Sequence, residues 1–267
     1  MCRFTAYIGN KKRFLSEVLS SPKNSLLGQS QASQFGEYRV HADGFGLGWY
    51  DKTVDEEPAV FRSVQPLWND LNFQSLSKKI KSNCFIGHVR AAYIGDVSIS
   101  NCQPFTNQTL LMVHNGNIQG FYDFKKQFVA HMTKNSFNLI QGTTDSEYFF
   151  QMVCGILTNK NQPHTLENIY QAVLDTFGLI RSLEAEHTDY FSRINMVLTN
   201  GIDMLATRWS SKQNDSELPL HLNDCKDQTL VSSEVLDSET GHWMEIPPQH
   251  CAFIKKGIFE KVIPIDI

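Results

Sequence analysis

The period of the apolar residues changes twice along the chain, and this order restricts the fold more than any other feature. Up to His114 and again from Ile194 onward, apolar residues alternate or form the short runs that are typical of strands. Between these regions they recur at the three- and four-residue spacing of amphipathic helices. Strands first, helices in the middle and strands at the end favour a layered α+β fold over a doubly wound parallel sheet, in which strand and helix would alternate throughout.

The boundaries follow from the same pattern. Strands are expected at residues 4–8, 44–50, 85–90, 110–114, 194–199, 205–208, 230–232, 242–246, 252–254 and 259–263. Helices are expected over 121–132, 144–157 and 166–180. No low-complexity linker, internal repeat or long charged block divides the chain, so we expect a single domain over residues 2–267.

The composition argues against several classes of protein. The 267 residues are 41% hydrophobic and 19% charged, with a net charge of −4, which is ordinary for a globular protein. We expect neither nucleic acid nor membrane as a partner, because there is no long basic run and no stretch of roughly 18 apolar residues. Nothing near the N-terminus resembles a signal peptide. Six scattered cysteines without a Cys-x-x-Cys pair predict a reducing, cytoplasmic location, with no metal site and no cofactor.

The first ten residues, MCRFTAYIGN, put a cysteine directly after the initiator methionine. Aminopeptidases remove the methionine efficiently when the next side chain is small, and we expect Met1 to be removed for this reason. Cys2 then carries a free α-amino group beside its thiol. This pairing is either an active site or a coincidence, and the position alone does not separate the two.

The segment HADGFGLGWY contains Gly44, Gly46 and Gly48, a spacing that does not fit a dinucleotide-binding loop. In a strand, the two-residue period places all three glycines on one face. Such a face either packs against another backbone or leaves a bare wall that the nucleophile's strand or a substrate can approach. The two interpretations are compatible.

Arg90, in GHVRAAYIG, lies at the end of an apolar strand and needs a partner, because an unpaired buried charge is very costly. The partner is either a structural acid or the carboxylate of a ligand, which suits the guanidinium fork.

Asn115 and Gly116, in MVHNGNIQGF, give the strongest short hairpin signal, a type I′ turn. A helix-like segment follows, however, and not a return strand. An asparagine amide beside a glycine N–H can also supply two donors to an oxyanion.

Asp145, in GTTDSEYFF, follows Thr144, which forms a T-x-x-E capping box with Glu147, so a helix should begin there. A carboxylate in the first turn is explained by the helix dipole, and it would equally bind the ammonium group of an amino-acid ligand.

Taken together, Cys2-Arg3 with its strand, then GHVR, HNG and TDSE, in this order, resemble the class II glutamine amidotransferases. The segments HADGFGLGWY, NCQPF and SSEVLD…HW are most similar to the stand-alone YafJ/EgtC-type members. The resemblance covers nearly the whole chain. It implies the fold of an N-terminal-nucleophile hydrolase, a four-layer αββα sandwich.

The resemblance also implies a role for each of the residues above. Cys2 is the nucleophile, and its own α-amino group is the general base. Asn115 and the Gly116 N–H form the oxyanion hole. Arg90 holds the α-carboxylate of the substrate and Asp145 its α-ammonium group. The reaction releases ammonia and glutamate from glutamine through a γ-glutamyl thioester.

Three functions stay open at this point. The leading one is a glutamine amidohydrolase that supplies ammonia to a separate acceptor enzyme. The second is a hydrolase of larger γ-glutamyl amides, and the third is a non-catalytic protein that binds glutamyl ligands. Tyr93 and Gln103 depart from residues that many family members have near the pocket, and they leave its leaving-group preference open.

Overall fold

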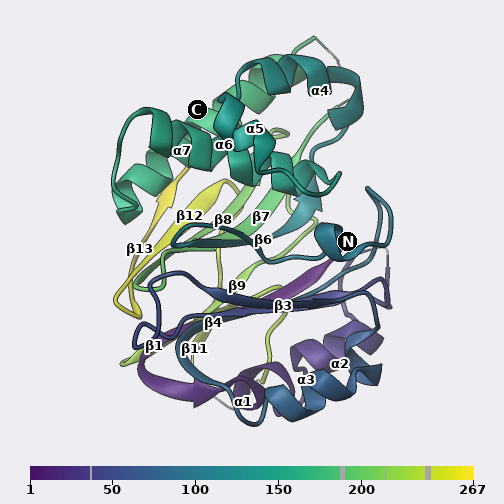
Figure 1. Cartoon of the computed structure of the whole chain (residues 1–267), viewed down its shortest axis with the longest axis vertical. Coiled ribbons are helices and arrows are strands. Elements are labelled where there is room, and N and C mark those ends of the chain that lie inside the picture. Colours follow the sequence, from purple (N-terminus) through teal and green to yellow (C-terminus); the bar gives the residue numbers. More distant parts are fainter. Residues whose placement is uncertain (37, 187–189, 214, 238–241) are drawn as a thin grey trace.

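Two antiparallel sheets lie face to face, and helices cover both outer faces (Figure 1). The computed structural model describes residues 1–36, 38–186, 190–213, 215–237 and 242–267. Part of the SSEVLD…HW motif, residues 238–241, lies outside the described residues. The layered α+β architecture expected from the order of periods is confirmed.

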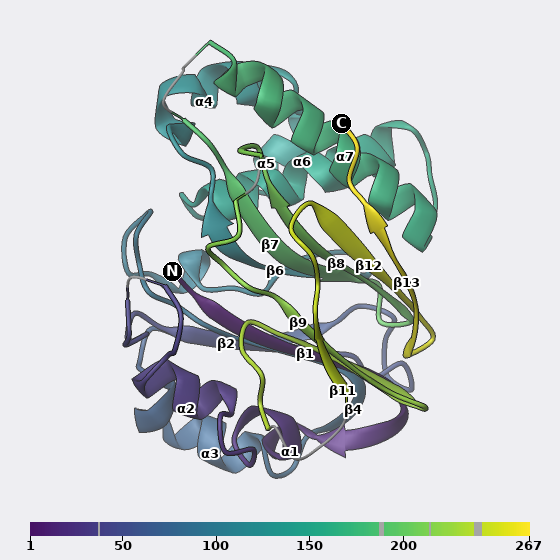
Figure 2. The same ribbon diagram turned by 180° about the vertical axis from the view of Figure 1, so that it is seen from behind.

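The sheet that carries the N-terminus has the strand order β11-β9-β10-β1-β4-β2-β3. Its strands are β1 (Arg3–Phe14), β2 (Phe45–Trp49), β3 (Ala59–Ser63), β4 (Lys81–Val89), β9 (His221–Cys225), β10 (Gln228–Ser232) and β11 (His242–Glu245). The long strand β1 lies in the middle of this sheet and pairs with β10 on one edge and β4 on the other. The start of the chain is therefore held by hydrogen bonds on both sides (Figure 2).

The second sheet has the order β13-β12-β8-β7-β6-β5. Its strands are β5 (Phe105–Asn107), β6 (Leu110–Asn117), β7 (Arg193–Thr199), β8 (Asp203–Ser210), β12 (His250–Lys255) and β13 (Ile258–Pro264). Strands β6 and β7 flank the helical segment in sequence and pair along their whole length.

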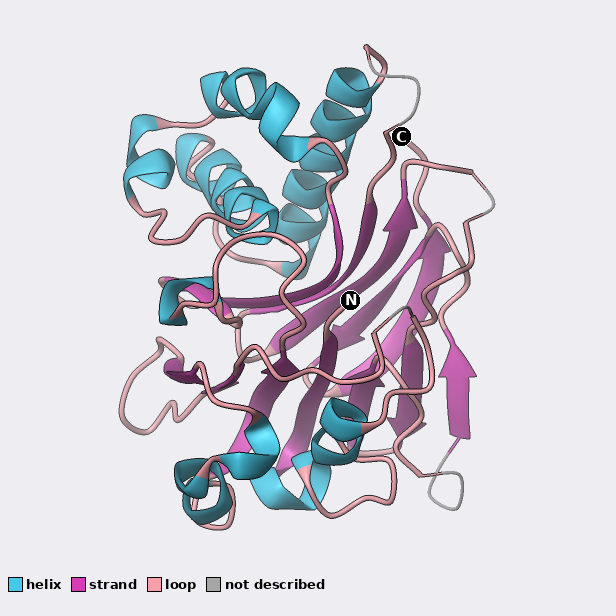
Figure 3. Ribbon diagram, turned by 90° about the vertical axis from the view of Figure 1, so that its right-hand side faces the viewer, coloured by secondary structure: helices cyan, strands magenta, loops and turns pink. Residues whose placement is uncertain are grey.

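Helices α1 (Leu15–Leu19), α2 (Leu26–Gln31) and α3 (Leu71–Leu76) pack on the first sheet, and α4 (Phe121–Ala130), α5 (Lys134–Asn138), α6 (Asp145–Asn159) and α7 (Leu166–Glu184) pack on the second (Figure 3). Short 3₁₀ turns occur at Leu67–Asn69 and Ile99–Asn101. In the described residues, the helices are too short or too polar to cross a bilayer.

Each interface between layers has its own apolar cluster. Alternate residues of β1 belong to two different clusters, one on each face of the sheet. Phe4, Ala6 and Ile8 point into the cluster between the sheets. Tyr7 points to the opposite face and packs with the cluster under α1 and α2. The sequence of β1 thus builds both clusters, one from each face.

The glycine face predicted on β2 packs against the chain segment that leads to the other sheet. A Cβ atom on Gly46 would overlap the backbone carbonyl of Gln103, and one on Gly48 would lie 2.9 Å from Pro104. Close approach of another backbone is therefore the reason for Gly46, whereas Gly48 leaves room for the side chains of Leu111 and Pro104.

Each of the ten predicted strands and three predicted helices overlaps an observed element, and the predicted ends extend past the observed ones by at most two residues. The strands β3, β5 and β9 and the short helices α1, α2, α3 and α5 were not predicted. The hairpin alternative for Asn115-Gly116 is wrong, because both residues lie inside β6 and pair with β7.

We predict that Gly46→Ala lowers the melting temperature, because the new methyl group meets a carbonyl that cannot rotate away. Overpacking of this kind costs about 1–3 kcal/mol, which corresponds to roughly 3–10 °C for a chain of this size. The control is Gly28→Ala in α2, where the nearest atom to the new Cβ is 3.6 Å away. Equal melting temperatures for the two variants by calorimetry would contradict the packing argument.

Candidate active site

The site forms where the apolar space between the two sheets ends. Along one face of β1, Ile8 and Phe4 lie in the apolar cluster, and Cys2 continues the same face at the open end. Along β6, Val113 lies in that cluster and Asn115 follows two residues later. Both strands therefore change from apolar to reactive side chains at the same end of the sandwich.

The peptide groups around Cys2 are held in place by side chains. The Nη1 atom of Arg3 donates to the carbonyls of Cys2 (2.8 Å) and Met1 (3.1 Å). The Met1 carbonyl also lies 2.6 Å from Nε2 of His41. The thiol of Cys2 donates weakly to the Ala91 carbonyl, with a sulfur–oxygen distance of 3.7 Å.

Arg3 is itself fixed by a buried ion pair with Glu234 at 2.8 Å, both side chains being 1% exposed. The carboxylate of Glu234 also accepts from the backbone N–H of Gln34 (2.9 Å) and from the amide of Asn24 (3.2 Å). The Arg3 guanidinium donates in addition to the Phe35 carbonyl. This network joins the first residues of the chain to the loop after α2 and to the end of β10.

Burial raises the pKa of the Cys2 thiol, against the opposing effects of the positive N-terminus, Arg90 and Arg3. The thiol is therefore protonated at rest and needs a base. Burial lowers the pKa of His41 to about 4 and that of His88 to about 3, so both are neutral at pH 7. Within the described residues, no histidine bonds to the Cys2 sulfur.

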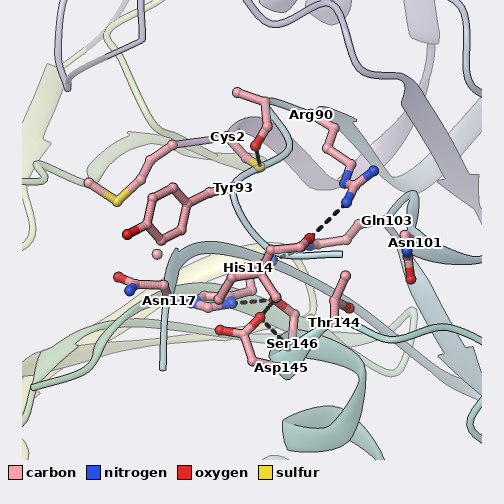
Figure 4. A pocket seen from close by; sticks show the side chains of 14 residues that line it. Cys2, Arg90, Tyr93, Asn101, Gln103, His114, Asn117, Thr144, Asp145 and Ser146 are labelled. Atoms are coloured by element: carbon pink, nitrogen blue, oxygen red, sulfur yellow. Dashed lines mark hydrogen bonds between the residues drawn. The ribbon is translucent and has the colours of Figure 1, made fainter. Parts of the chain in front are cut away.

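A pocket of about 40 Å³ opens beside Cys2 (Figure 4). It is lined by Met1, Cys2, Arg90, Ala91, Tyr93, Ile94, Asn101, Gln103, His114, Gly116, Asn117, Thr144, Asp145 and Ser146. An adjoining cavity of about 230 Å³ shares Met1, Tyr93 and Asn117 with the pocket. Of the predicted site residues, Cys2, Arg90, Gly116 and Asp145 line the pocket directly.

Arg90 is buried directly after β4, and within the protein it pairs with backbone carbonyls and not with the structural acid that the sequence suggested. Its Nη1 donates to the Asp96 carbonyl (2.9 Å), and its Nη2 donates to the carbonyls of Ile94 (2.9 Å) and Gly95 (3.0 Å). The guanidinium thus orders the loop that carries Tyr93 while it also lines the pocket. Substrate binding by Arg90 stays a prediction.

Asn115 and Gly116 lie side by side in β6, where Gly116 has a φ of +148°. A Cβ atom there would overlap the Arg193 carbonyl, so only glycine fits. The side chain of Asn115 is buried, and its Oδ1 has no hydrogen-bond partner in the part of the chain that the structure describes. A buried acceptor without a partner is costly and often marks a functional site.

Asp145 is the first residue of α6 and is buried. Its Oδ2 accepts from the Ile118 N–H (2.7 Å) and its Oδ1 from the Ser146 N–H (2.7 Å). The carboxylate therefore fixes the chain just after the Asn115-Gly116 pair as well as the start of the helix. Its predicted contact with a substrate ammonium group is not tested by these bonds.

Only half of the predicted capping box is present. Thr144 accepts from the Glu147 N–H as expected, at 3.4 Å. The Glu147 carboxylate does not return to the Thr144 N–H but accepts from the N–H groups of Gln141 (2.9 Å) and Gly142 (2.7 Å). It stabilises the loop before the helix, because two consecutive N–H groups point toward it there.

Sequence reasoning missed the residues that support the site. Arg3 and Glu234 belong to quoted motifs, but their partnership spans 231 positions and leaves no local pattern. Gln103 was expected near the pocket, and its Oε1 accepts from the His114 N–H at 2.5 Å, which fixes the orientation of its amide.

Comparison with known proteins places the chain in a family. The family model for class II glutamine amidotransferases matches residues 16–218. The chain belongs to this family. The amidotransferase is 31% identical to the probable glutamine amidotransferase DUG3 of Saccharomyces cerevisiae, over 96% of this chain and 82% of the yeast protein. It is 29% identical to the gamma-glutamyl-hercynylcysteine sulfoxide hydrolase of Mycolicibacterium smegmatis, over 96% of each.

Solved structures confirm the fold of the amidotransferase. A class II domain protein from Silicibacter pomeroyi superposes with a TM-score of 0.71 at 22% identity, over 98% of this chain and 99% of that one. The glutamine phosphoribosylpyrophosphate amidotransferase of Bacillus subtilis gives a TM-score of 0.66 at 16% identity, over all of this chain and 50% of that one. The predicted four-layer αββα sandwich is therefore confirmed, whereas the N-terminal nucleophile stays a prediction.

We predict that Glu234→Gln destabilises the amidotransferase strongly, because it leaves the buried Arg3 charge without its counter-ion. Breaking one side of a buried pair costs about 3–5 kcal/mol. Glu56→Gln is the control, because Glu56 is 67% exposed in its pair with Lys52 and such pairs contribute at most about 1 kcal/mol. Chemical denaturation measures both, and similar small losses would mean that the Arg3–Glu234 pair does not hold the N-terminus.

Proposed function

We propose that Cys2, freed of Met1, is the nucleophile that cleaves the side-chain amide in this amidotransferase. The observation that carries the proposal is the pocket itself. It joins Cys2, directly before β1, to the end of β6, the start of α6 and Arg90, directly after β4, four segments far apart in sequence. Every residue type that the reaction needs comes from one of these segments.

The α-amino group of Cys2 serves as the general base. Because burial keeps the thiol protonated, the proton must move before attack, and the neighbouring amine is the base nearest to the sulfur once Met1 is gone. The thiolate then attacks the side-chain carbonyl, and the protonated amine returns the proton to the departing nitrogen. Water hydrolyses the resulting γ-glutamyl thioester and releases glutamate.

The oxyanion of each tetrahedral intermediate accepts from the Asn115 amide and the Gly116 N–H. The position of Gly116 supports this assignment, since it lines the pocket directly after Asn115 and has a backbone conformation that only glycine fits there. The unpartnered Oδ1 of Asn115 supports it too, because the same amide can accept from the Cys2 amine while its Nδ2 donates to the oxyanion.

The glutamyl end of the substrate binds between Arg90 and Asp145. Both groups line the pocket with opposite charges, which suits an α-carboxylate and an α-ammonium group. Both are also fixed by backbone partners, so their positions are set before the substrate arrives. Preorganised charges avoid the cost of ordering side chains during binding.

A hydrolase of larger γ-glutamyl amides is the second candidate, and the adjoining cavity favours it. That cavity holds about 230 Å³ on the side of Cys2 where Tyr93 and Asn117 lie, whereas the pocket holds about 40 Å³. Two of the relatives are named as hydrolases of a γ-glutamyl conjugate. We therefore propose that the leaving group can exceed ammonia.

For use of free glutamine, the proposal includes a separate acceptor enzyme for the ammonia. We also propose a cytoplasmic location, because the six cysteines are free thiols.

We predict that a thiol-alkylating glutamine analogue labels Cys2 and nothing else, and that Cys2→Ala abolishes both labelling and hydrolysis. Intact mass reads the label and, in the same spectrum, shows whether Met1 has been removed. An uncleavable N-terminal fusion should be inactive because its amine is blocked. Binding of the analogue without labelling would instead favour the non-catalytic, ligand-binding alternative.

Asn115→Ala should lower kcat by roughly 10²–10³, the usual effect of losing one oxyanion donor. KM should change much less, because the interaction strengthens only in the transition state. The control is Asn107→Ala on β5, which removes a hydrogen bond to Gln151 away from the pocket. A change in KM alone would make Asn115 a structural or ground-state residue.

A further inference from the structure

The cavity next to the catalytic pocket is built from aromatic and charged side chains. Tyr38, Tyr93 and Phe191 line it together with Arg193 and Glu217. Figure 4 shows that Tyr93 and Asn117, which belong to both spaces, lie on the side of the pocket opposite Arg90 and Gln103. A leaving group that departs from Cys2 away from the glutamyl end therefore enters this cavity.

Arg193 lies close to the oxyanion strand by register. It is the first residue of β7 and pairs directly with Asn117 of β6, two positions after Asn115. Residues opposite each other in an antiparallel pair project to the same face of the sheet. The guanidinium of Arg193 thus reaches the leaving-group side of the reacting carbonyl.

Two carboxylates, one buried and one exposed, contact the guanidinium of Arg193. Asp215 accepts from Nε (2.6 Å) and Nη2 (3.2 Å), a two-point contact with a side chain that is 9% exposed. Glu217 contacts Nη2 only and is 56% exposed. Nη1 has no hydrogen-bond partner within the described ranges. Asp215 therefore orients the guanidinium, whereas the contact with Glu217 is weak and easily exchanged.

The pKa of Asp215 agrees with this division of roles. Burial raises it, but the hydrogen bond and charge of Arg193 outweigh burial, so its pKa lies below the ordinary range. Asp215 stays ionised and bound at neutral pH.

We propose that Arg193 binds a carboxylate on the departing amine, and that Glu217 occupies this position until such a substrate displaces it. The inference rests on the proposed function and extends it, since it assigns γ-glutamyl amides of α-amino acids as the preferred substrates. When Glu217 moves away, Arg193 and Lys212, which both lie over Phe191, leave one net positive charge against Asp215. The aromatic walls then cover the amino-acid side chain.

The alternative occupant is a cationic amine held by Glu217 and the aromatic rings. The geometry favours the anion, because the nitrogen donors of Arg193 are fixed by Asp215, whereas Glu217 is mostly exposed. The two occupants respond in opposite directions to the loss of the Glu217 charge.

The experiment compares kcat/KM for γ-glutamyl-alanine and γ-glutamyl-ethylamide, which differ only by the carboxylate. We expect Glu217→Gln to raise the ratio of the two values about 3- to 10-fold, and Arg193→Gln to lower it at least tenfold. Glu56→Gln is the control, because Glu56 is 67% exposed in its pair with Lys52, and neither residue lines the pocket or the adjoining cavity. It should leave the ratio unchanged.

An unchanged ratio in Glu217→Gln, or a selective loss of activity toward the aminoethyl amide of γ-glutamate in that variant, overturns the inference. Glutamine hydrolysis by the wild-type protein distinguishes a failure of the Arg193 inference from a failure of the proposed function. If glutamine is hydrolysed and labels appear on Cys2 while the ratio does not respond, only the Arg193 subsite is wrong. If Cys2 is inert toward every substrate, the proposed function itself fails.

Discussion

The buried ion pair between Arg3 and Glu234 sets the position from which the rest of the site is built. Removing both charges from water is costly, and the pair is tolerated only because other donors and acceptors complete its hydrogen bonding. Those additional contacts order the start of the chain, since the guanidinium donates to the carbonyls of Met1 and Cys2. A flexible first residue of a chain would otherwise fray.

At the same end of the sandwich, the side chains of a strand change from apolar core residues to polar residues of the site, while the strand keeps its backbone geometry. Strand β6 keeps its register with β7 through Val113, Asn115 and Asn117, while its side chains change from apolar to amide. Because the hydrogen-bond ladder between β6 and β7 is unbroken, the backbone under the polar side chains is held as firmly as the backbone under the apolar ones. The price is a buried amide oxygen without a partner at Asn115.

Local patterns were sufficient to predict the fold class, every long helix and the strands that form the apolar layers. The unpredicted β3 is an edge strand with half-exposed side chains, and helices α1 and α2 have five and six residues, too few to show a helical period. The motifs predicted segments that the structure brings together around one pocket, since each motif is contiguous in the sequence. What they could not give were partners: the carbonyls around Arg90 depend on how a loop folds, and Arg3 meets Glu234 only after the whole sheet has formed.

The contacts of Met1 have a consequence for the order of maturation. Its carbonyl contacts both Arg3 and His41, and Met1 lines the pocket as well as the adjoining cavity. Under the proposed function, a methionine that is still attached when these contacts form blocks the amine of Cys2. The fraction of active molecules in a preparation then depends on methionine removal as much as on folding.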